Sequence, residues 1–505
     1  MSSQRDTPAG HRAGWRLQQS YREGLPAIFY TQTAPTPVNR PGLALFNVEL
    51  AGDLGLDPDH FEEPAGAAEL TGNTLPQGAE PLAQAYAGHQ FGHFTMLGDG
   101  RALVLGEQMA PDGSRWDVQY KGSGPTPFSR RGDGRAALGP MLREYLVSES
   151  LHALGIPTTR SLAVATTGES VYRETPLPGA VLTRVAASHI RVGTFQYAAA
   201  QRPQQVKALA DYTLERHYPD IAPDPDRYCN LLERFLERQI RLVAQWLGVG
   251  FIHGVMNTDN VALSGETIDY GPCAFMDTYD PATVFSSIDH HGRYAYGNQA
   301  RIALWNGARF AETLLPLLSG AEKKAVQLAE EILLNANKQF EAQWLTIFHA
   351  KLGGLQATQA DKNLIRSLLT WMQTHQADFI NTFAHLTVLA RTRANGQAPP
   401  PSNAPWNDET FAAWCRRWQA HCDALPGTPA SKAALMQTHN PTVIPRNHQV
   451  ESALAAAVTR LDFAPLQQLL TVCKQPYNYD LPPADTYRTP APPDWARTFQ
   501  TFCGT

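Results

Sequence analysis

Asp259, Asn260 and Asp269 lie close together in the stretch GFIHGVMNTDNVALSGETIDYGP, residues 250–272. Their carboxylate and amide oxygens are hard donors, which suit Mg²⁺ or Mn²⁺ when phosphate and water oxygens complete the coordination shell. A metal ion in such a shell neutralises the charge of phosphate groups. The residue types therefore predict metal-assisted phosphate chemistry, with Asn260 and Asp269 as the metal ligands.

The same stretch has the spacing of the catalytic and metal loops of protein kinases, with one part missing. His253 and Asn260 are separated as the histidine and asparagine of the kinase loop are, and Asp-Tyr-Gly at 269–271 stands in for Asp-Phe-Gly. The position of the kinase catalytic aspartate holds Val255. Asp259 is the nearest spare carboxylate, so we expect it to accept the proton. We expect His253 to be buried and to brace the loop through hydrogen bonds.

A tight turn near 264–266 predicts a hairpin in VALSGETID. Antiparallel pairing around that turn places Asn260 nearly opposite Asp269, so that the two proposed metal ligands meet. The alternative is that 257–260 is a turn whose asparagine and aspartate side chains only cap their own backbone.

A Gly-Asp-Gly-Arg unit occurs twice, in LGDGRALVLGE at 97–107 and in RRGDGRAALG at 130–139. Glycine lets backbone amides approach a phosphate, and arginine supplies a bidentate donor. Either unit alone is more often a tight turn. The second loop also crowds arginines together, which is unfavourable unless an anion binds there. Together the two loops predict a phosphate site.

Two elements must position these groups. In RWDVQYKG, residues 115–122, apolar and polar side chains alternate as in a half-buried strand, which places Lys121 on the polar face. The next segment predicts a helix that starts at Pro140, stops at Gly155 and carries Glu144. A strand lysine followed by a helix glutamate is the order of the kinase small lobe, where the glutamate holds the lysine on the nucleotide phosphates. The alternative is a surface salt bridge.

Arg184 and Arg191, in GAVLTRVAASHIRVGTFQ, come where a kinase has its last small-lobe strand and the hinge that reads adenine. Arginine is a poor partner for the adenine edge and a good one for phosphate. If both arginines face the cleft, the nucleotide lies reversed, with its phosphates toward the hinge side. The alternative is a solvated pair of charges.

The chain of 505 residues has 47 acidic and 42 basic side chains, which gives a net charge of −5. Its length predicts a two-lobed enzyme or a core with an accessory region. The acidic balance argues against a dedicated nucleic-acid binder. We expect a cytoplasmic protein without membrane contact, because no apolar run of about 18 residues and no secretory signal is present. A mitochondrial location applies only if the source is eukaryotic. Six cysteines in so long a chain predict reduced thiols.

The residue pattern changes along the chain. Residues 1–80 are rich in proline and glycine and predict irregular structure, whereas short alternating segments dominate 95–185. Beyond 275 the period is helical, with a proline-rich break at 395–406. The final segment, 476–505, combines proline with aromatic residues, which predicts a tail that docks on the body of the protein. The predicted fold class is α+β.

The motifs resemble those of one known family. YAGHQFG, LGDGRA, QYKGSGPTPFSRRGDGRA, LREYLVSE, LGIPTTR, RVAASHIR, GFIHGVMNTDN, TIDYGPCAFMD and NPTVIPRNH, in this order, are similar to the selenoprotein O family, also called the YdiU family. The resemblance implies a protein-kinase-like two-lobed fold that binds ATP in inverted orientation. It implies transfer of AMP, rather than phosphate, to serine, threonine or tyrosine hydroxyls of target proteins. Bacterial members are also associated with UMP transfer from UTP in the presence of Mn²⁺.

The resemblance further implies a division of the chain. An N-terminal extension at 1–80 packs on a small lobe at 81–190. A helical large lobe with the catalytic and metal loops follows at 191–475, and a docking tail at 476–505 closes the chain.

Site residues carry over from the family motifs position by position. Asp259 is the implied proton acceptor, Asn260 and Asp269 are the implied metal ligands, and Glu144 supports Lys121. The implied nucleotide contacts are Gly98, Gly100, Arg101, Lys121, Asp133, Gly134, Arg184, Arg191 and Asp269.

Two other functions stay open at this point. One is a genuine kinase for a protein or a small molecule, and the other is a nucleotide-binding scaffold without turnover. An AMP adduct, a phosphate adduct or no adduct on an acceptor protein separates the three.

Cys273 and Cys503 suggest a redox device. Cys273 lies shortly after Asp269, and Cys503 lies in the tail, near the terminus where eukaryotic relatives place selenocysteine. We hypothesise a reversible disulfide between them that fastens the tail over the site and restrains activity until a reductant opens it. The alternative is that Cys273 is a small buried apolar residue and Cys503 a free thiol.

Overall fold

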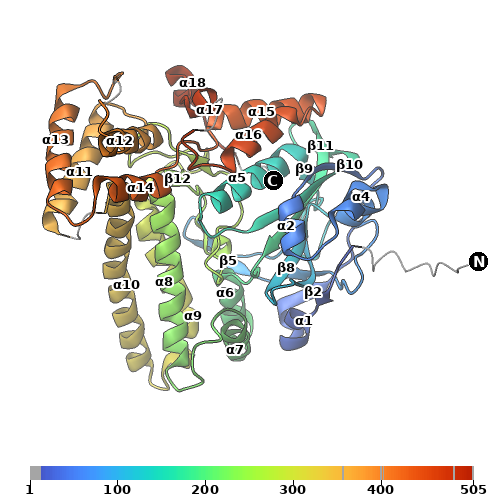
Figure 1. Cartoon of the computed structure of the whole chain (residues 1–505). Helices are drawn as coiled ribbons and strands as arrows, with labels where there is room; N and C mark the ends of the chain where they lie inside the picture. Colours follow the sequence, from blue (N-terminus) through green and yellow to red (C-terminus); the bar gives the residue numbers. More distant parts are fainter. Residues whose placement is uncertain (1–12, 355–357, 399–400, 402, 481–483, 503–505) are drawn as a thin grey trace, which may run out of the picture.

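The computed structural model describes residues 13–354, 358–398, 401, 403–480 and 484–502. A large sheet from the first part of the chain stands beside long helices from the second part (Figure 1). The mixed helix-and-strand architecture that the sequence predicted is therefore confirmed.

The main sheet is antiparallel throughout. Within the described ranges it has nine strands in the order β2-β4-β7-β8-β11-β10-β3, with β1 beside β7 and β9 beside β11. Strand β8 lies between β7 and β11, near the centre. The strands are β1 Leu17–Gln18, β2 Tyr30–Gln32, β3 Gly42–Phe46, β4 Leu82–Gln84, β7 Ala102–Met109, β8 Arg115–Lys121, β9 Ala136–Ala137, β10 Arg160–Tyr172 and β11 Pro176–Ala186.

Two short pairs of strands lie outside the main sheet. They are β5 Ala87–Gln90 with β6 His93–Met96, and β12 Phe251–Ile252 with β13 Ala274–Phe275.

Strand β8 forms where the sequence predicted it, but it is not half-buried. Val118 and Tyr120 pack in a hydrophobic cluster with side chains of β7, β10 and β11, as the alternation indicated. The polar face is buried as well, since Gln119 is fully buried and Lys121 is 7% exposed. The alternation predicted which side chains share a face, but it did not predict that both faces are buried. The polar face can be buried because its side chains bond to charged residues inside the molecule.

Helix α5, Leu138–Ala153, confirms the predicted helix and starts slightly before Pro140. Gly155, in the left-handed conformation with φ of +75°, follows its end as predicted. The helix packs against β10 and β11 and carries Glu144, which is 3% exposed. The sheet and this helix thus fix the lysine and glutamate of the predicted pair.

The N-terminal part is more regular than the sequence predicted. Its strands β1 to β3 join the main sheet, and Trp15 packs edge-on against Phe61, with ring centroids 6.0 Å apart. The expectation of irregular structure is wrong because prolines such as Pro58 and Pro64 stand at helix starts, where they are tolerated. The helices here are α1 Ser20–Gly24, α2 Val48–Asp53, α3 Pro58–Glu62 and α4 Pro64–Leu70.

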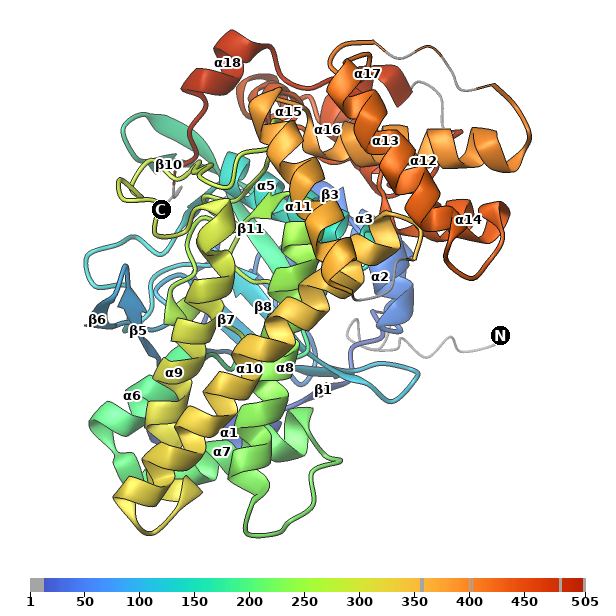
Figure 2. The ribbon, with the colours of Figure 1, turned by 90° about the vertical axis from the view of Figure 1, so that its left-hand side faces the viewer.

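The second part of the chain is helical, as its period predicted. Helices α8, α9 and α10 pack on one another and cross in front of the sheet in Figure 2. The proline-rich break is confirmed, because α12 ends at Ala394 and α13 begins at Glu409. None of the described helices is long and apolar enough to cross a membrane. The helices are α6 Val192–Gln201, α7 Val206–His217, α8 Arg227–Gly248, α9 Gln299–Leu318, α10 Glu322–Lys351, α11 Gln359–Thr374, α12 Phe379–Ala394, α13 Glu409–Asp423, α14 Pro429–His439, α15 Asn447–Arg460, α16 Ala464–Cys473, α17 Ala484–Arg488 and α18 Pro493–Thr498.

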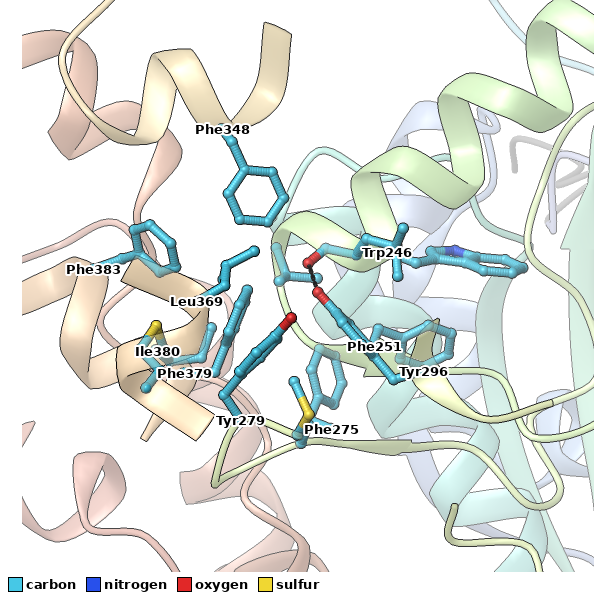
Figure 3. Packing of buried hydrophobic residues seen from close by; sticks show 14 of the residues in the cluster. Trp246, Phe251, Phe275, Tyr279, Tyr296, Phe348, Leu369, Phe379, Ile380 and Phe383 are labelled. Atoms are coloured by element: carbon cyan, nitrogen blue, oxygen red, sulfur yellow. Dashed lines mark hydrogen bonds between the residues drawn. The ribbon is translucent and has the colours of Figure 1, made fainter. Parts of the chain in front are cut away.

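An aromatic core anchors the segment that carries the candidate metal ligands (Figure 3). Phe251 of β12 and Phe275 of β13 pack edge-on, with ring centroids 5.2 Å apart. Trp246 of α8 contacts Phe251 and stacks on His253 at 5.4 Å. Both ends of the segment between β12 and β13 are therefore fixed in the core.

That segment does not form the predicted hairpin. The turn is present, since Gly265 (φ +82°) donates its N–H to the carbonyl of Ala262 at 3.1 Å. The arms, however, pair with other parts of the chain: Ala262 pairs with Arg191, and Thr267 pairs with Thr158. The prediction is wrong because backbone groups on both sides of the turn bond to segments that are distant in sequence.

The described part of the tail docks, as predicted. The backbone N–H of Thr501 donates to the carbonyl of Phe285 at 2.8 Å, and its hydroxyl donates to the carbonyl of Pro272 at 2.7 Å. Trp495 and Phe499 stack at 4.7 Å, and Phe499 lies 5.6 Å from Phe285. The tail is thus fastened to the segment that follows Asp-Tyr-Gly.

The last residue of α10 is a buried lysine. Lys351 is fully buried, and its Nζ lies 4.4 Å from the ring centroid of Phe383 and 5.8 Å from that of Phe379. Within the described part of the chain, its Nζ donates to the carbonyl of His439 at 3.3 Å. Burial lowers the pKa of Lys351 to about 7. Because the unfolded chain keeps the ordinary lysine pKa of about 10.4, it binds one more proton than the folded chain between these values.

We predict that this lysine makes the free energy of unfolding rise with pH above about 7. The slope contributed by one such group is at most about 1.4 kcal/mol per pH unit. Lys351→Met should remove that contribution and stabilise the fold most at or below pH 7, as measured by urea unfolding at several pH values. Lys207→Met, at an exposed position, is the matched control. Parallel pH curves for the wild type and Lys351→Met would contradict the assignment.

Candidate active site

One cavity of about 1210 Å³ collects the predicted site residues. Its walls come from the main sheet, α5, α15, the 250–272 segment and the tail. Nucleotide-sized ligands occupy pockets of about 300–1,000 Å³, so this cavity has room for a nucleotide and part of a second reactant. The predicted residues that line it are Gly98, Gly100, Arg101, Lys121, Asp133, Gly134, Glu144, Arg184, Arg191, Asp259, Asn260 and Asp269.

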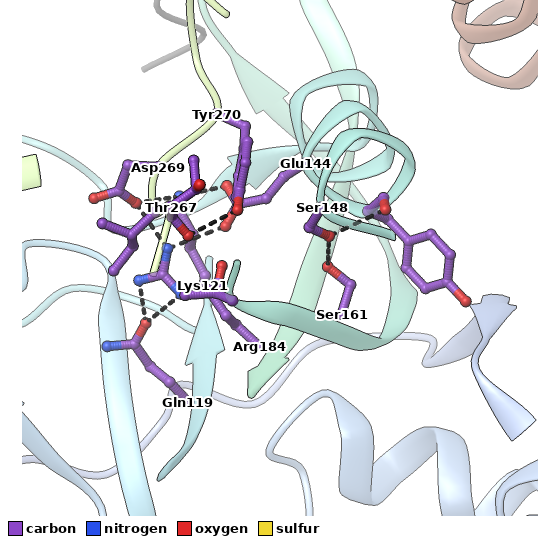
Figure 4. A network of polar contacts seen from close by, with 12 residues as sticks. Gln119, Lys121, Glu144, Ser148, Ser161, Arg184, Thr267, Asp269 and Tyr270 are labelled. Carbon is purple, nitrogen blue, oxygen red and sulfur yellow. Dashed lines mark hydrogen bonds and ion pairs between the residues drawn. The ribbon is translucent and has the colours of Figure 1, made fainter. Parts of the chain in front are cut away.

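The ammonium group of Lys121 lies between two carboxylates. Nζ donates to Oε2 of Glu144 at 2.6 Å and to Oδ1 of Asp269 at 2.9 Å (Figure 4). The side chains of Lys121 and Glu144 are only 9% and 4% exposed. The predicted pair is confirmed, and the alternative of a surface salt bridge is wrong.

Two arginines reach the same carboxylate. Nη1 of Arg184, on β11, donates to Oδ1 of Asp269 at 2.7 Å and to Oε1 of Glu144 at 3.1 Å. Nη1 of Arg191, just before α6, donates to Oδ2 of Asp269 at 2.6 Å and to the carbonyl of Asp259 at 2.7 Å. Both arginines are buried and line the cavity, so they are not a solvated pair.

Asp269 is the centre of this cluster. Burial opposes its ionisation, but Lys121, Arg191 and Arg184 outweigh that effect and hold the pKa of Asp269 well below its usual range. Its backbone has φ of +65°, a left-handed conformation that side chains rarely adopt and that is concentrated at functional sites. The N–H groups of three cations outnumber the two oxygens of one carboxylate, so phosphate oxygens are suitable further acceptors.

Asp259 lies in the wall of the cavity and is 6% exposed. Its Oδ2 accepts from Nε2 of Gln90 at 3.4 Å, and its Oδ1 has no hydrogen-bond partner in the described part of the chain. Gly88 packs against it so closely that a Cβ there would lie 2.3 Å from Oδ1. Burial raises the pKa of Asp259 to about 6. A buried carboxylate with one unpartnered oxygen is suited to accept a proton.

The loop around Asp259 is braced from outside. His253 is buried and donates from Nε2 to the carbonyl of Ile268 at 2.9 Å, which confirms its bracing role. Asn257 does not cap its own turn, because its Oδ1 accepts from the backbone N–H of Phe91 at 3.0 Å and from the hydroxyl of Tyr294 at 2.6 Å. The alternative of a self-capping turn is therefore wrong.

The first Gly-Asp-Gly loop is packed beneath the cavity. The hydroxyl of Thr126 donates to the carbonyl of Asp99 at 2.6 Å, and Oδ2 of Asp99 accepts from the backbone N–H of Gln84 at 3.1 Å. A Cβ on Gly98 would lie 2.4 Å from the ring of Phe128, so a side chain at this position would collide. Gly98, Asp99 and Gly100 all line the cavity, and the two glycines let the backbone approach a ligand closely.

The second Gly-Asp-Gly loop lies at the rim. Asp133 accepts from Arg173 at 2.8 Å, and Arg135 lies 3.4 Å from Glu169. The hydrogen bond from Arg173 holds the pKa of Asp133 below its usual range. The arginines at 130–131 are exposed and have no ion pair among the described residues. The crowding of charge noted in the sequence is thus relieved in part by acidic partners.

The oxygen donors of the cavity fit a divalent cation shared with phosphates. Nδ2 of Asn260 donates to the carbonyl of Val255 at 3.0 Å, which leaves its amide oxygen as a donor to a metal. That oxygen and the carboxylate of Asp269 line the same cavity. No group of three or more His, Cys, Asp or Glu within the described ranges is arranged to hold a metal. One or two protein oxygens together with substrate phosphates are the usual surroundings of Mg²⁺.

Sequence reasoning missed three residues that hold the cations. Oε1 of Gln119 accepts from Nε and Nη2 of Arg184 at 3.1 and 2.6 Å. The guanidinium of Arg191 lies 4.7 Å from the ring centroid of Tyr86, and 4.0 Å from the carboxylate of Asp99, whose pKa burial raises to about 6. The alternation in β8 could have indicated Gln119, because it places this residue on the same face of the strand as Lys121. Nothing local marked Tyr86.

Of the two cysteines in the predicted disulfide, the structure describes Cys273 alone. Cys273 is buried beside Pro272, and its Sγ donates to the carbonyl of Tyr270 at 3.3 Å. Cys503 lies outside the described residues.

Cavity, cations and oxygen donors together define a nucleotide-binding enzyme that acts on a phosphate group. Comparison with known proteins identifies the family. The family model described as "Protein adenylyltransferase SelO" matches residues 17–474. The chain is 55% identical over 493 residues to "Protein nucleotidyltransferase YdiU" of Brevibacillus brevis, which covers 97% of this chain and 98% of that protein. It is 54% identical over 508 residues to the protein of the same name from Halalkalibacterium halodurans, which covers 100% of both. The chain belongs to the SelO family.

We predict that Asp269→Asn lowers the free energy of unfolding by about 2 kcal/mol, because three buried cations lose their shared counter-charge. Urea unfolding followed by tryptophan fluorescence measures the change. Asp133→Asn is the matched control, since it breaks an ion pair at the rim and should cost at most about 0.5 kcal/mol. Equal stability of the two variants would show that Asp269 does not organise the cluster.

Proposed function

We propose that this protein transfers AMP from ATP to hydroxyl side chains of target proteins. The observation that carries the proposal is the convergence of Lys121, Arg184 and Arg191 on one carboxylate at the inner end of the cavity. A triphosphate bound there places its adenosine toward the rim, which is the reverse of the order in a kinase. The family description and the names of the relatives agree with this chemistry.

The proposal includes the kinase-like organisation of the chain. A small lobe at 81–190, with the extension 1–80 packed on it, supplies the lysine, the glutamate and the glycine loops. A helical large lobe at 191–475 supplies the loop with Asp259, and the tail at 476–505 closes the cavity. Strand β8, helix α5 and the 250–272 segment stand in the order that this organisation requires.

Transfer is a substitution at the α-phosphorus of ATP. The acceptor oxygen forms a bond to that phosphorus, and the bond from phosphorus to the bridging oxygen breaks. Pyrophosphate leaves with the bonding electrons, and Asp259 accepts the proton of the hydroxyl. Lys121, Arg184 and Arg191 bind the leaving phosphates and stabilise their charge. Asn260 and Asp269 would hold Mg²⁺ or Mn²⁺, which when bound neutralises phosphate charge.

This arrangement explains why valine is tolerated at position 255. In a kinase the base stands beside the γ-phosphate at the end of the triphosphate. With the nucleotide reversed, the reacting atom is the α-phosphorus, and Asp259 is a buried carboxylate of the cavity with one oxygen that has no hydrogen-bond partner among the described residues. Uridine nucleotides present the same phosphates, so UTP is included in the proposal as a second donor substrate.

We predict that the wild type adds the mass of AMP to a generic protein acceptor in the presence of ATP and Mg²⁺ or Mn²⁺. Intact mass spectrometry measures the adduct. Asp259→Asn should lower the rate about 100-fold or more, which is a usual loss for a missing general base. Glu451→Gln is the matched control, because it changes another carboxylate of the cavity, on α15, that has no part in the proposed mechanism. A phosphate adduct would identify a kinase, and no adduct would indicate a scaffold.

We also propose the reversible disulfide between Cys273 and Cys503. Thr501, two residues before Cys503, is fastened to Pro272, the neighbour of Cys273. Thr501 of the docked tail therefore lies close to the residue that carries the buried thiol. Aromatic residues of the tail, among them Trp495 and Phe499, line the cavity, so a bond that holds them there restricts entry to the site.

We predict that oxidised protein contains a linked peptide with both cysteines and regains transfer activity when dithiothreitol is added. A peptide map without reductant and an activity assay measure the two effects. Cys503→Ser should be active without reductant, whereas Cys229→Ser, at a cysteine on α8 away from the cavity, should behave as the wild type. Absence of the linked peptide, or equal activity with and without reductant, would end the proposal.

A further inference from the structure

The hairpin β5–β6 has one edge bound to the catalytic loop and one edge that pairs with no other strand of the described chain. On the bound edge, the backbone N–H of His89 donates to the hydroxyl of Thr258 at 2.7 Å, and that of Phe91 donates to Oδ1 of Asn257 at 3.0 Å. Strand β6 forms the other edge, and Figure 2 shows it at the margin of the molecule. The hairpin is therefore a fixed extension of the catalytic loop.

The backbone groups on the outer edge of β6 follow from its register. Phe91 and Gly92 both have positive φ, as in a two-residue turn of type I′, and Leu97 donates its N–H to the carbonyl of Tyr86 at 3.0 Å. Antiparallel pairs alternate between hydrogen-bonded and non-hydrogen-bonded. Since 86 and 97 are a bonded pair, so are 88 with 95 and 90 with 93. The N–H and C=O groups of residues 94 and 96 thus point away from β5.

The outer edge is also apolar. Phe94 and Met96 are 46% and 38% exposed, and they lie on one face of the strand because they are two positions apart. No described residue forms a hydrogen bond with the backbone of either. Unpaired strand edges are normally protected by charge, proline or a covering element, and β6 contains neither lysine nor proline. An exposed edge of this kind is a template for strand addition.

A cationic and aromatic cluster adjoins the apolar face. The ring of His89 lies 5.3 Å from Phe94 and 5.4 Å from Trp305 of α9. The guanidinium groups of Arg293 and Arg309 lie 4.7 and 5.1 Å from the ring of Trp305. Nη2 of Arg309 pairs with Oε1 of Glu312 at 2.6 Å, whereas Arg293 has no ion pair among the described residues. The positive charge of Arg293 therefore favours an acidic side chain in a segment that binds beside β6.

The opposite face of the hairpin belongs to the cavity. Gly88 touches Asp259, and Gln90 donates to it and lines the cavity. A strand added to β6 would lie about 10 Å from β5, which is two strand spacings. A hydroxyl a few residues beyond the added strand then reaches Asp259 through a short turn.

We propose that the outer edge of β6 binds an extended segment of the acceptor protein as a third strand. The segment has apolar residues at alternate positions, which pack on Phe94 and Met96, and an acidic residue near Arg293. The modified hydroxyl follows a few residues away. This inference rests on the proposed function, because it assigns the docking site of the acceptor.

A peptide-binding measurement tests the edge without turnover. The probe is a fluorescein-labelled peptide of about 12 residues that alternates valine and glutamine, carries flanking aspartates and ends in glycines and one tyrosine. Fluorescence anisotropy gives its Kd. Met96→Pro blocks the edge without removing a hydrogen bond of the hairpin, because that N–H points outward. Phe94→Ser removes the apolar contact and keeps the backbone. Both should weaken binding about tenfold or more.

The controls distinguish strand addition at β6 from other ways in which the peptide could bind. Leu334→Ser, at an exposed apolar residue of α10, should bind the peptide as the wild type does, and the affinity for ATP should be unchanged in all three variants. A peptide with proline in place of the central glutamine should not bind. Equal binding by the wild type, Met96→Pro and Phe94→Ser would overturn the proposal. So would a dimer that Met96→Pro abolishes, or displacement of the peptide by single-stranded DNA.

Transfer to the tyrosine of the peptide distinguishes failure of docking from failure of the chemistry. The KM for the peptide should rise about tenfold in Met96→Pro and Phe94→Ser, with the KM for ATP unchanged. AMP transfer that is indifferent to both variants would overturn the docking site and leave the function standing. Binding that depends on β6, without any transfer, would support the edge as a peptide site and count against the proposed function.

Discussion

The carboxylate of Asp269 accepts hydrogen bonds from three cationic side chains, and the rest of the site depends on that convergence. Lys121 comes from the central strand β8, Arg184 from β11 and Arg191 from the start of α6. Because all three cations bond to one carboxylate, the ion pairs constrain how β8, β11 and the start of α6 are placed relative to one another. A buried charge without a partner is strongly unfavourable, so the ion pairs fix the geometry of the cavity before any ligand arrives.

The same convergence assigns roles to the remaining residues. Glu144 accepts hydrogen bonds from Lys121 and Arg184, and Gln119 accepts from Arg184, which fixes both cations in the wall of the cavity. Asp259, the neighbour of Asn260, lies in the wall with one oxygen that no described residue contacts through a hydrogen bond. In the proposed mechanism the cations bind the phosphates and Asp259 accepts the proton, and preorganised groups of this kind lower the cost of reaching a transition state.

The sequence predicted the composition of the site better than its surroundings. Lys121, Glu144 and Asp269 were found because each residue type has few chemical uses at that spacing. The arms of the 260–269 segment were assigned to a hairpin, and they pair instead with residues near 158 and 191, which no local pattern can indicate. The buried polar face of β8 was missed for a related reason, since alternation reports two faces but not what covers each.

The cavity can be completed only late in the synthesis of the chain, because the tail forms part of its wall. Trp495, Phe499 and Phe502 form part of its wall, while the sheet and the cations come from the first half of the chain. Synthesis proceeds from the N-terminus, and early parts of a chain fold while later ones are still being made. A nascent molecule therefore has its charge centre long before it has a complete cavity. The enclosing wall is finished only when residues 495–502 have been added and have docked.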